Sequence, residues 1–316
     1  GGRVNSDFKA ELTPVKLLGL YGTADLNKVT AQVNQLPQAF NNSQGRLQFK
    51  GTEIYLDNVA SSYGKIPAVA KGSLDIEKGF NLSAYVDAVS AAAAISSLNL
   101  QVPVPIDGVF RSQVKLTGPV EAAVLTGDVV NIKPVRLDRL NISRVSTNFT
   151  LDTAAGTLNF PNISATPAAG GKVTGGGTLK LALKPEQTAG LDLKFIANNI
   201  PGDAIAKAYG VTNQAAKVGI VTAQAQVTGT PDKPRTVVNW QAPQATYPGK
   251  GQLVIYNANN LFLRDTIFRV AGGDVSAAGE LVNQRWKAAI KASGVRLGQL
   301  TQVPPSLQNP VNGTFN

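Results

Sequence analysis

The 316-residue sequence contains no cysteine, no histidine and no methionine. Without cysteine and histidine, the usual structural zinc site cannot form, and neither can a Ser-His or Cys-His nucleophile pair. Disulfide bonds are excluded as well. A chain without thiols suits an oxidising compartment such as a periplasm, but does not require one. We therefore expect no metal site and no cofactor.

Long apolar runs are also missing. No stretch of 18 or more apolar residues occurs, so the sequence predicts no membrane-spanning helix. The most apolar stretch, residues 88–100, is interrupted by serine and asparagine. The chain starts at Gly1, and no signal or transit segment is recognisable. We interpret it as a soluble excerpt of a longer protein whose membrane anchor would lie elsewhere.

Aromatic residues are few, at 6%, and the net charge of +10 is spread along the chain. The densest basic group comprises Lys133, Arg136, Arg139 and Arg144, with Asp138 among them. Nucleic-acid sites combine a compact basic face with stacking aromatics, so we expect no nucleic-acid partner. The basic residues are expected on solvated exteriors, with attraction to anionic lipid headgroups as an alternative.

Acidic residues do not gather in the sequence. Paired carboxylates are needed for glycoside hydrolysis, and some β-solenoid enzymes cut polysaccharides with aspartate clusters. Most aspartates here stand singly on expected strands or turns: Asp57, Asp75, Asp87, Asp128, Asp152 and Asp192. We expect no catalytic residue and no enzymatic activity, and keep a solenoid hydrolase as an alternative.

The sequence is rich in period-two alternation, which is typical of strands with one buried face. In residues 172–184, Val173, Leu179, Leu181 and Leu183 share one parity, and lysines and threonines share the other. Similar runs occupy residues 110–117, 144–151 and 221–228, separated by glycine- and asparagine-rich turns. A short helix is expected over 203–209, with Asp203 as its N-cap and Gly210 as its stop.

A repeat of about a hundred residues organises these strands. Three blocks, each with a strand, a Gly turn and a Gly-x-Leu start to the next strand, place their turns at Gly64, Gly171 and Gly273. A second shared passage follows each block, at residues 82–88, 193–199 and 286–293, and then an irregular or helical connection. We expect residues 1–44 to end a preceding module. Repeat 1 would span 45–150, repeat 2 would span 151–250 and a partial repeat 3 would span 251–316, within one elongated β domain.

The pattern from Gly272 to Leu281, with the Leu-Thr-Gly-Pro run at 116–119 and the Val-Thr-Gly-Thr-Pro run at 227–231, resembles the repeats of TamB and other AsmA-like envelope proteins. The composition suits a TamB segment, of the cyanobacterial or the chloroplast-envelope branch. The resemblance implies an all-β fold, an extended, twisted sheet curled into an open gutter (a β-taco), with one or two short helices.

The resemblance further implies a periplasmic, intermembrane segment of a protein anchored in the inner membrane. Such a segment would conduct lipids between envelope membranes, or support outer-membrane protein assembly with a barrel-insertase partner. Phospholipid acyl chains would lie in the groove. Its expected lining is Phe110, Val114, Leu116, Leu179, Leu181, Leu183, Leu191, Leu193 and Phe195.

The same alternation is open to a plainer interpretation. These apolar side chains could form the core of a closed β-helix or sandwich that serves as a structural or adhesive spacer. The two hypotheses differ in whether a second layer covers the apolar face.

Overall fold

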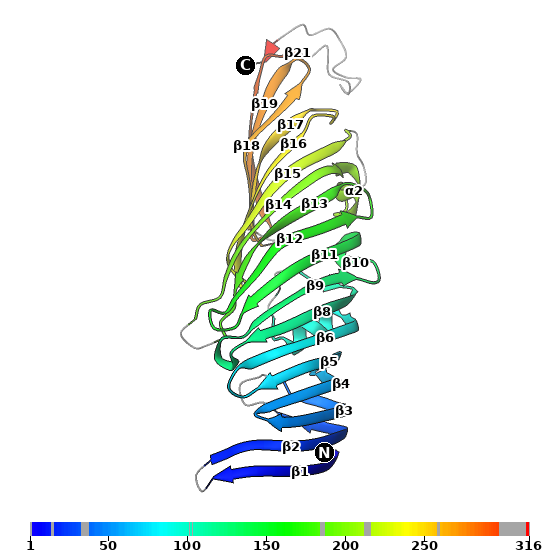
Figure 1. Cartoon of the computed structure of the whole chain (residues 1–316). Helices are drawn as coiled ribbons and strands as arrows, with labels where there is room; N and C mark the ends of the chain where they lie inside the picture. Colours follow the sequence, from blue (N-terminus) through cyan, green and yellow to red (C-terminus); the bar gives the residue numbers. More distant parts are fainter. Residues whose placement is uncertain are drawn as a thin grey trace. The chain divides into compact units, whose positions relative to one another are not determined.

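The computed structural model describes residues 2–13, 16–32, 38–100, 102, 104–183, 187–211, 216–257, 260–296 and 314–315. Strands dominate these residues, with two short α-helices and one 3-10 turn (Figure 1). The chain divides into two compact units. Unit 1 comprises Gly1–Ala165 and Gly176–Ala189, and unit 2 comprises Thr166–Gly175 and Gly190–Asn316.

Unit 1 is built from a series of antiparallel strands. Each of β1 to β5 pairs with the next strand. The series continues from β6 to β8, β9 and β11, while the short β10 pairs with β7 and β11. The elements are β1 (Arg3–Thr13), β2 (Lys16–Ala31), β3 (Phe40–Gly51), β4 (Glu53–Tyr63), β5 (Ile66–Asp75), β6 (Gly79–Ser90), α1 (Ala91–Ser97), β7 (Ile106–Asp107), β8 (Val109–Gly118), η1 (Val120–Ala122), β9 (Val124–Asn131), β10 (Val135–Leu137) and β11 (Leu140–Asp152).

Two strands, β12 (Thr157–Pro167) and β13 (Lys172–Lys180), contribute residues to both units. In unit 2, each strand from β14 to β19 pairs antiparallel with the next, up to β20. The elements are β14 (Gly190–Pro201), α2 (Gly202–Ala208), β15 (Ile220–Thr230), β16 (Lys233–Ala242), β17 (Gly249–Asn257), β18 (Asn260–Val270), β19 (Gly273–Val282), β20 (Arg285–Ser293), β21 (Val295–Arg296) and β22 (Thr314–Phe315). The last two pair with each other.

The sheet does not close on itself. Among the described strands, the only ladder of β1 is with β2 and the only ladder of β20 is with β19. The predicted fold class, all-β with an open antiparallel sheet and two short helices, is confirmed. A closed β-helix does not agree with this structure, because its strands would pair in parallel around a closed coil.

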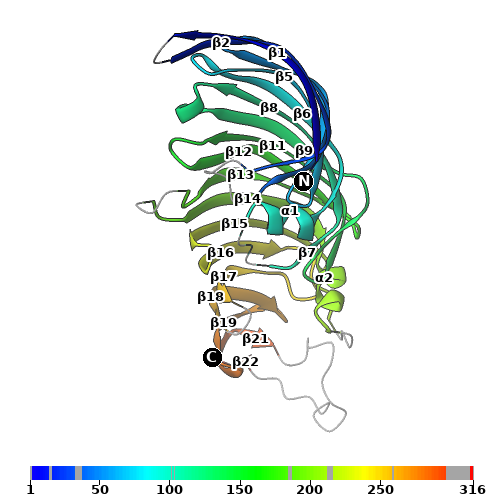
Figure 2. The ribbon, with the colours of Figure 1, turned by 90° about the horizontal axis from the view of Figure 1, so that it is seen from below.

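The strands bend at β-bulges that contain a residue in the left-handed conformation. Lys28 in β2, Asn58 in β4, Asn199 in β14 and Asp265 in β18 have φ of 54°, 47°, 53° and 45°. The pairing register shifts at each of these positions. An extra residue bends a strand and increases its twist, and asparagine and aspartate tolerate this conformation comparatively well. In unit 1, the strands are visibly curved along their length (Figure 2).

The repeat anchors fall on equivalent elements. Gly64, Gly171 and Gly273 lie at the β4–β5, β12–β13 and β18–β19 hairpins, and the second shared passage forms β6, β14 and β20. The first two irregular connections contain α1 and α2. Residues 297–313, where the third copy would continue, lie outside the described residues. The proposed repeat boundaries stay a prediction.

The helix expected near residue 203 exists as α2, but its start differs from the expectation. Pro201, not Asp203, is the N-cap residue. The Asp203 carboxylate instead accepts hydrogen bonds from the backbone N–H groups of Val218 and Gly219, at 2.7 and 3.1 Å. Asp203 therefore ties the helix to the segment that leads into β15, a contact that local sequence does not reveal.

Candidate functional site

In unit 2, one face of the sheet carries two continuous rows of mostly apolar residues. Directly opposed residues of antiparallel strands share a face, so the register defines the rows. One row is Leu193, Val227, Thr236, Ile255, Leu261, Leu281 and Trp286; the next is Phe195, Ala225, Val238, Leu253, Leu263, Gly279 and Ala288. We name this surface the apolar face of unit 2. At about 4.8 Å between neighbouring strands, each row extends about 29 Å across the sheet.

Unit 1 has a corresponding apolar face. Its longest row crosses nine strands and comprises Ser6, Ala24, Leu47, Leu56, Gly72, Leu82, Leu116, Leu125 and Leu151. A parallel row comprises Phe8, Gly22, Phe49, Ile54, Leu74, Phe80 and Gly118. One apolar band therefore runs across the strands of unit 1, perpendicular to their direction.

The opposite faces are mainly polar. In unit 1, the Arg46 guanidinium donates to Asp25 at 2.7 Å, and both side chains are more than half exposed. In unit 2, Gln252 donates to Asn239 across β16 and β17 at 3.0 Å. Alternation along each strand thus separates an apolar from a polar surface, as the sequence predicted.

The apolar faces are shielded without a second layer. Within each unit, extensive contact between strands joins hydrogen-bonded neighbours, and the described residues form no second sheet other than the two-stranded β21–β22 beside β19 and β20. Even so, Leu193 and Phe195 are half-buried, whereas Ile196 on the opposite face of β14 is 45% exposed. Side chains on a concave surface crowd together, so in β14 this difference marks the apolar face as the inner side of a trough. On the opposite face, Val254 of β17 is also buried, at 1% exposure.

Few residues are fully buried, which also separates this fold from a sandwich. The buried apolar side chains of the described residues are mostly small, and the large leucines of both rows are not among them. A closed sandwich would bury those leucines between two layers. Here they line a surface that is covered only by its own curvature.

The nine residues expected to line the groove lie on three strands and one loop. Phe110, Val114 and Leu116 are on β8 in unit 1, and Leu191, Leu193 and Phe195 are on β14 in unit 2. All six are half-buried. Leu116, Leu193 and Phe195 belong to the rows described above, and their role as a lipid lining stays a prediction.

The remaining three expected lining residues lie in β13 or just after its end. Leu179 is in the strand, but β13 ends at Lys180, whereas alternation predicted a strand through residue 184. The backbone N–H of Leu181 donates to the carbonyl of Gly156 at 2.7 Å, and Leu183 is 51% exposed. The backbone N–H of Leu183 donates to the carbonyl of Leu181 at 2.9 Å, a tight turn that ends the extended run, and sequence parity gives no sign of this.

Sequence reasoning missed much of the apolar face. Trp240 and Phe268, whose ring centroids are 5.9 Å apart, lie on it, as do Leu253, Leu261 and Trp286. The signal was present as alternation in residues 236–240, 253–255 and 261–263. It is short in each strand, and only pairing with the neighbouring strands makes it continuous.

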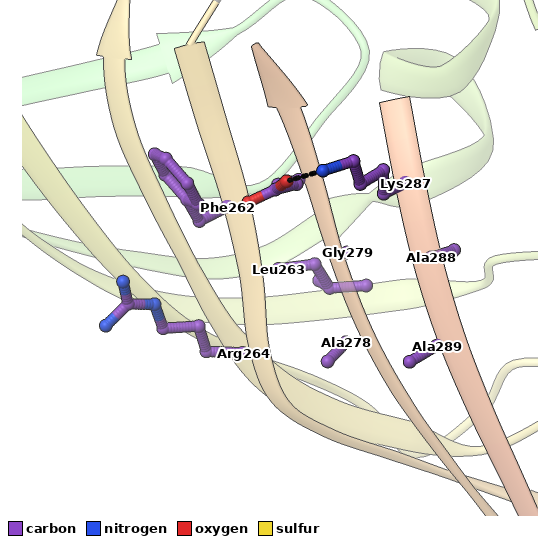
Figure 3. A pocket seen from close by; sticks show the side chains of 9 residues that line it. Phe262, Leu263, Arg264, Ala278, Gly279, Lys287, Ala288 and Ala289 are labelled. Atoms are coloured by element: carbon purple, nitrogen blue, oxygen red, sulfur yellow. Dashed lines mark ion pairs between the residues drawn. The ribbon is translucent and has the colours of Figure 1, made fainter. Parts of the chain in front are cut away.

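A shallow hollow of about 420 Å³ lies on the other face of unit 2 (Figure 3). Phe262, Arg264, Glu280 and Lys287 surround small residues of β19 and β20. Lys287 and Glu280 form an ion pair at 3.5 Å, and the Arg264 guanidinium lies 5.6 Å from the centre of the Phe262 ring. The charged groups of the hollow thus contact one another or an aromatic ring. The hollow therefore resembles an ordinary packed polar surface and not a ligand site.

The carboxylates with shifted pKa values have local explanations. The hydrogen bond from Arg46 lowers the pKa of Asp25. The hydrogen bond from the Tyr55 hydroxyl, 2.6 Å long, lowers the pKa of Glu53. Backbone N–H groups of Glu77 and Lys78 lower the pKa of Asp75, a buried residue in the β5–β6 turn. These three shifts thus arise from sheet and turn contacts.

Two kinds of site are absent from the described residues. In that part of the chain, no helix has both the length and the apolar character to cross a membrane. The same residues contain no group of three or more acidic side chains placed to hold a metal ion.

The fold and its faces thus define an all-β protein whose open antiparallel sheet carries an apolar trough. Comparison with known proteins gives two chloroplast relatives. The chain is 25% identical over 282 residues to "Protein TIC236, chloroplastic" of Arabidopsis thaliana, with 76% of this chain and 13% of that protein aligned. It is 22% identical over 259 residues to "Protein SUBSTANDARD STARCH GRAIN 4, chloroplastic" of Oryza sativa subsp. japonica, with 72% of this chain and 12% of that protein aligned.

The chain therefore spans about an eighth of the length of these curated relatives. No family model matches it, and no solved structure does. Both relatives carry chloroplastic names, which agrees with the chloroplast branch of the resemblance found in the sequence.

Proposed function

We propose that this chain is an intermembrane segment of an envelope protein and that its apolar faces hold the acyl chains of phospholipids. The continuous apolar rows across seven strands of unit 2 and nine strands of unit 1 carry the proposal. Each methylene that leaves water contributes about 0.8 kcal/mol. Because apolar contact has no preferred direction, a bound chain can slide along the rows.

The resemblances of the chain support a cellular location for the whole protein. The TamB-like repeats and the two chloroplast relatives support a place in a chloroplast or related bacterial envelope. We propose that the whole protein is anchored in the inner membrane and that this part lies between the membranes. It acts there without a catalytic residue or cofactor.

A second candidate function is support of outer-membrane protein assembly with a barrel-insertase partner. The open antiparallel sheet of the described strands favours it. An edge strand with free backbone groups can pair with a strand of another protein.

Photo-crosslinking in cells tests the lipid function with matched neighbours. A crosslinking residue at Leu193 faces the trough, whereas one at Lys194, the next residue in β14, faces solvent. Leu116 and Lys115 of β8 form the corresponding pair in unit 1. We expect lipid adducts at the leucine positions several times more often than at the lysine positions. Equal capture at both positions of each pair would reject the lipid function.

A further inference from the structure

Two aromatic side chains of unit 2 meet across a strand that carries glycines beneath them. Trp240 of β16 is opposite Gly251 of β17, and Phe268 of β18 is opposite Gly249 of the same strand. The two rings are therefore separated by β17, yet their centroids are 5.9 Å apart and their planes are inclined by 42°. They can meet because neither glycine has a side chain between them.

The Phe268 ring occupies the space of a missing side chain. A Cβ atom built on Gly249 would lie 2.5 Å from Phe268 Cδ1 and 2.9 Å from Phe268 Cε1. Gly249 does not have a left-handed backbone, so its conformation does not demand glycine. Glycine is required at residue 249 because the Phe268 ring needs the space that a side chain would occupy.

The same arrangement occurs in unit 1. Phe8 of β1 and Phe49 of β3 are both opposite Gly22 of β2, and their centroids are 5.0 Å apart with the rings perpendicular. A glycine in a strand leaves a depression, and a neighbouring aromatic ring can cover it. At Gly249, the Phe268 ring fills the depression instead of standing above the sheet.

We propose that Gly249, Phe268 and Trp240 form a subsite that sets the depth of the trough and selects unbranched acyl chains. The inference rests on the proposed lipid function. Because the Phe268 ring lies down on Gly249, space remains above it for a linear chain. The two rings fill the bottom of the trough, so methyl branches would collide with them. A side chain at residue 249 raises the ring and makes the trough shallower. Loss of the ring opens a hollow that admits the branches.

The experiment uses the natural reporter at the subsite. The chain has two tryptophans, Trp240 and Trp286, and Trp286 is 74% exposed on β20. In a Trp286→Phe background, the fluorescence of Trp240 reports the subsite alone. Dibrominated stearate quenches this fluorescence when it binds, and unlabelled stearate or the methyl-branched phytanate then competes with the brominated chain.

Three variants in this background are compared. Gly249→Ala is expected to weaken stearate binding about tenfold, since the raised ring excludes one to two methylenes. Phe268→Ala is expected to reverse or abolish the preference for stearate over phytanate. Lys250→Ala is the matched control, because Lys250 is the residue after Gly249 in β17 and its side chain is exposed on the opposite face. Its binding should stay within twofold.

The outcomes separate the inference from the proposed function. Absence of quenching in the folded background protein overturns lipid binding on this face and the inference with it. Quenching with an unchanged stearate-to-phytanate ratio in Gly249→Ala and Phe268→Ala overturns the subsite and leaves lipid binding standing. If circular dichroism shows that Gly249→Ala does not fold, the ratio in Phe268→Ala decides. A changed ratio in Lys250→Ala as well would also reject the assignment.

Discussion

The rings of Phe8 and Phe49 touch edge to face although β2 runs between their strands. Gly22 is opposite both phenylalanines, and its φ of 137° is one that other residues rarely adopt. A Cβ at this position would also collide with the backbone oxygen of Asp7. The contact links three strands at one edge of unit 1.

Replacement of Gly22 tests this link. We expect Gly22→Ala to lower the free energy of unfolding by about 1–3 kcal/mol through backbone strain, with further loss from the collision. Urea titration followed by circular dichroism measures the change. Gly210→Ala is the control, because Gly210 has φ of 90° but no atom within 4 Å of its added Cβ. Equal losses in both variants would argue against a role for the space above Gly22.

The bulge at Asp265 offers a test of how the strands bend. Asp265→Gly should leave the free energy of unfolding nearly unchanged, since glycine accepts a φ of 45° freely. Asp265→Val should lower it by about 1–2 kcal/mol, because a branched side chain is disfavoured in this conformation. Thermal and urea unfolding of both variants measure the difference. A valine variant as stable as the wild type would show that the bulge is not held in the left-handed form.

Asp75 should make stability depend on pH. The folded state lowers its pKa through hydrogen bonds from the N–H groups of Glu77 and Lys78. Its stabilisation is therefore present above the unfolded pKa of about 3.9 and is lost as pH falls through the lower folded pKa. Asp75→Asn should destabilise the protein at pH 7 more than at pH 2.5. Urea titrations at the two pH values test this, and a loss independent of pH would contradict it.

Asp203 should hold the start of β15. Asp203→Ala removes the acceptor of two backbone hydrogen bonds, and we expect the free energy of unfolding to fall by about 1–3 kcal/mol. Asp203→Asn, which keeps one acceptor oxygen, should recover part of the loss. Asp192→Ala, on the exposed polar side of β14, serves as control and should change stability by less than about 0.5 kcal/mol. Hydrogen exchange at Val218 and Gly219 localises the effect, and unchanged protection there would refute the role of Asp203.

Local patterns sufficed for several parts of the structure. Alternation at Phe110, Val114 and Leu116 placed β8 and its apolar side correctly, because side-chain parity is a property of a single strand. The glycine turns at Gly64, Gly171 and Gly273 were found because hairpins use local backbone geometry. The connection after β14 was predicted as a helix for the same reason.

Other features depend on neighbours that lie far away in the sequence. The sequence alone determined that the chain is β-rich, repetitive and two-faced, since these properties need only residue type and spacing. The tertiary structure decided where β13 ends, what Asp203 binds, and which aromatic rings meet over Gly22 and Gly249. Those outcomes depend on cross-strand register and on the space left by a glycine in the next strand, and neither quantity is present in the local pattern of a single segment.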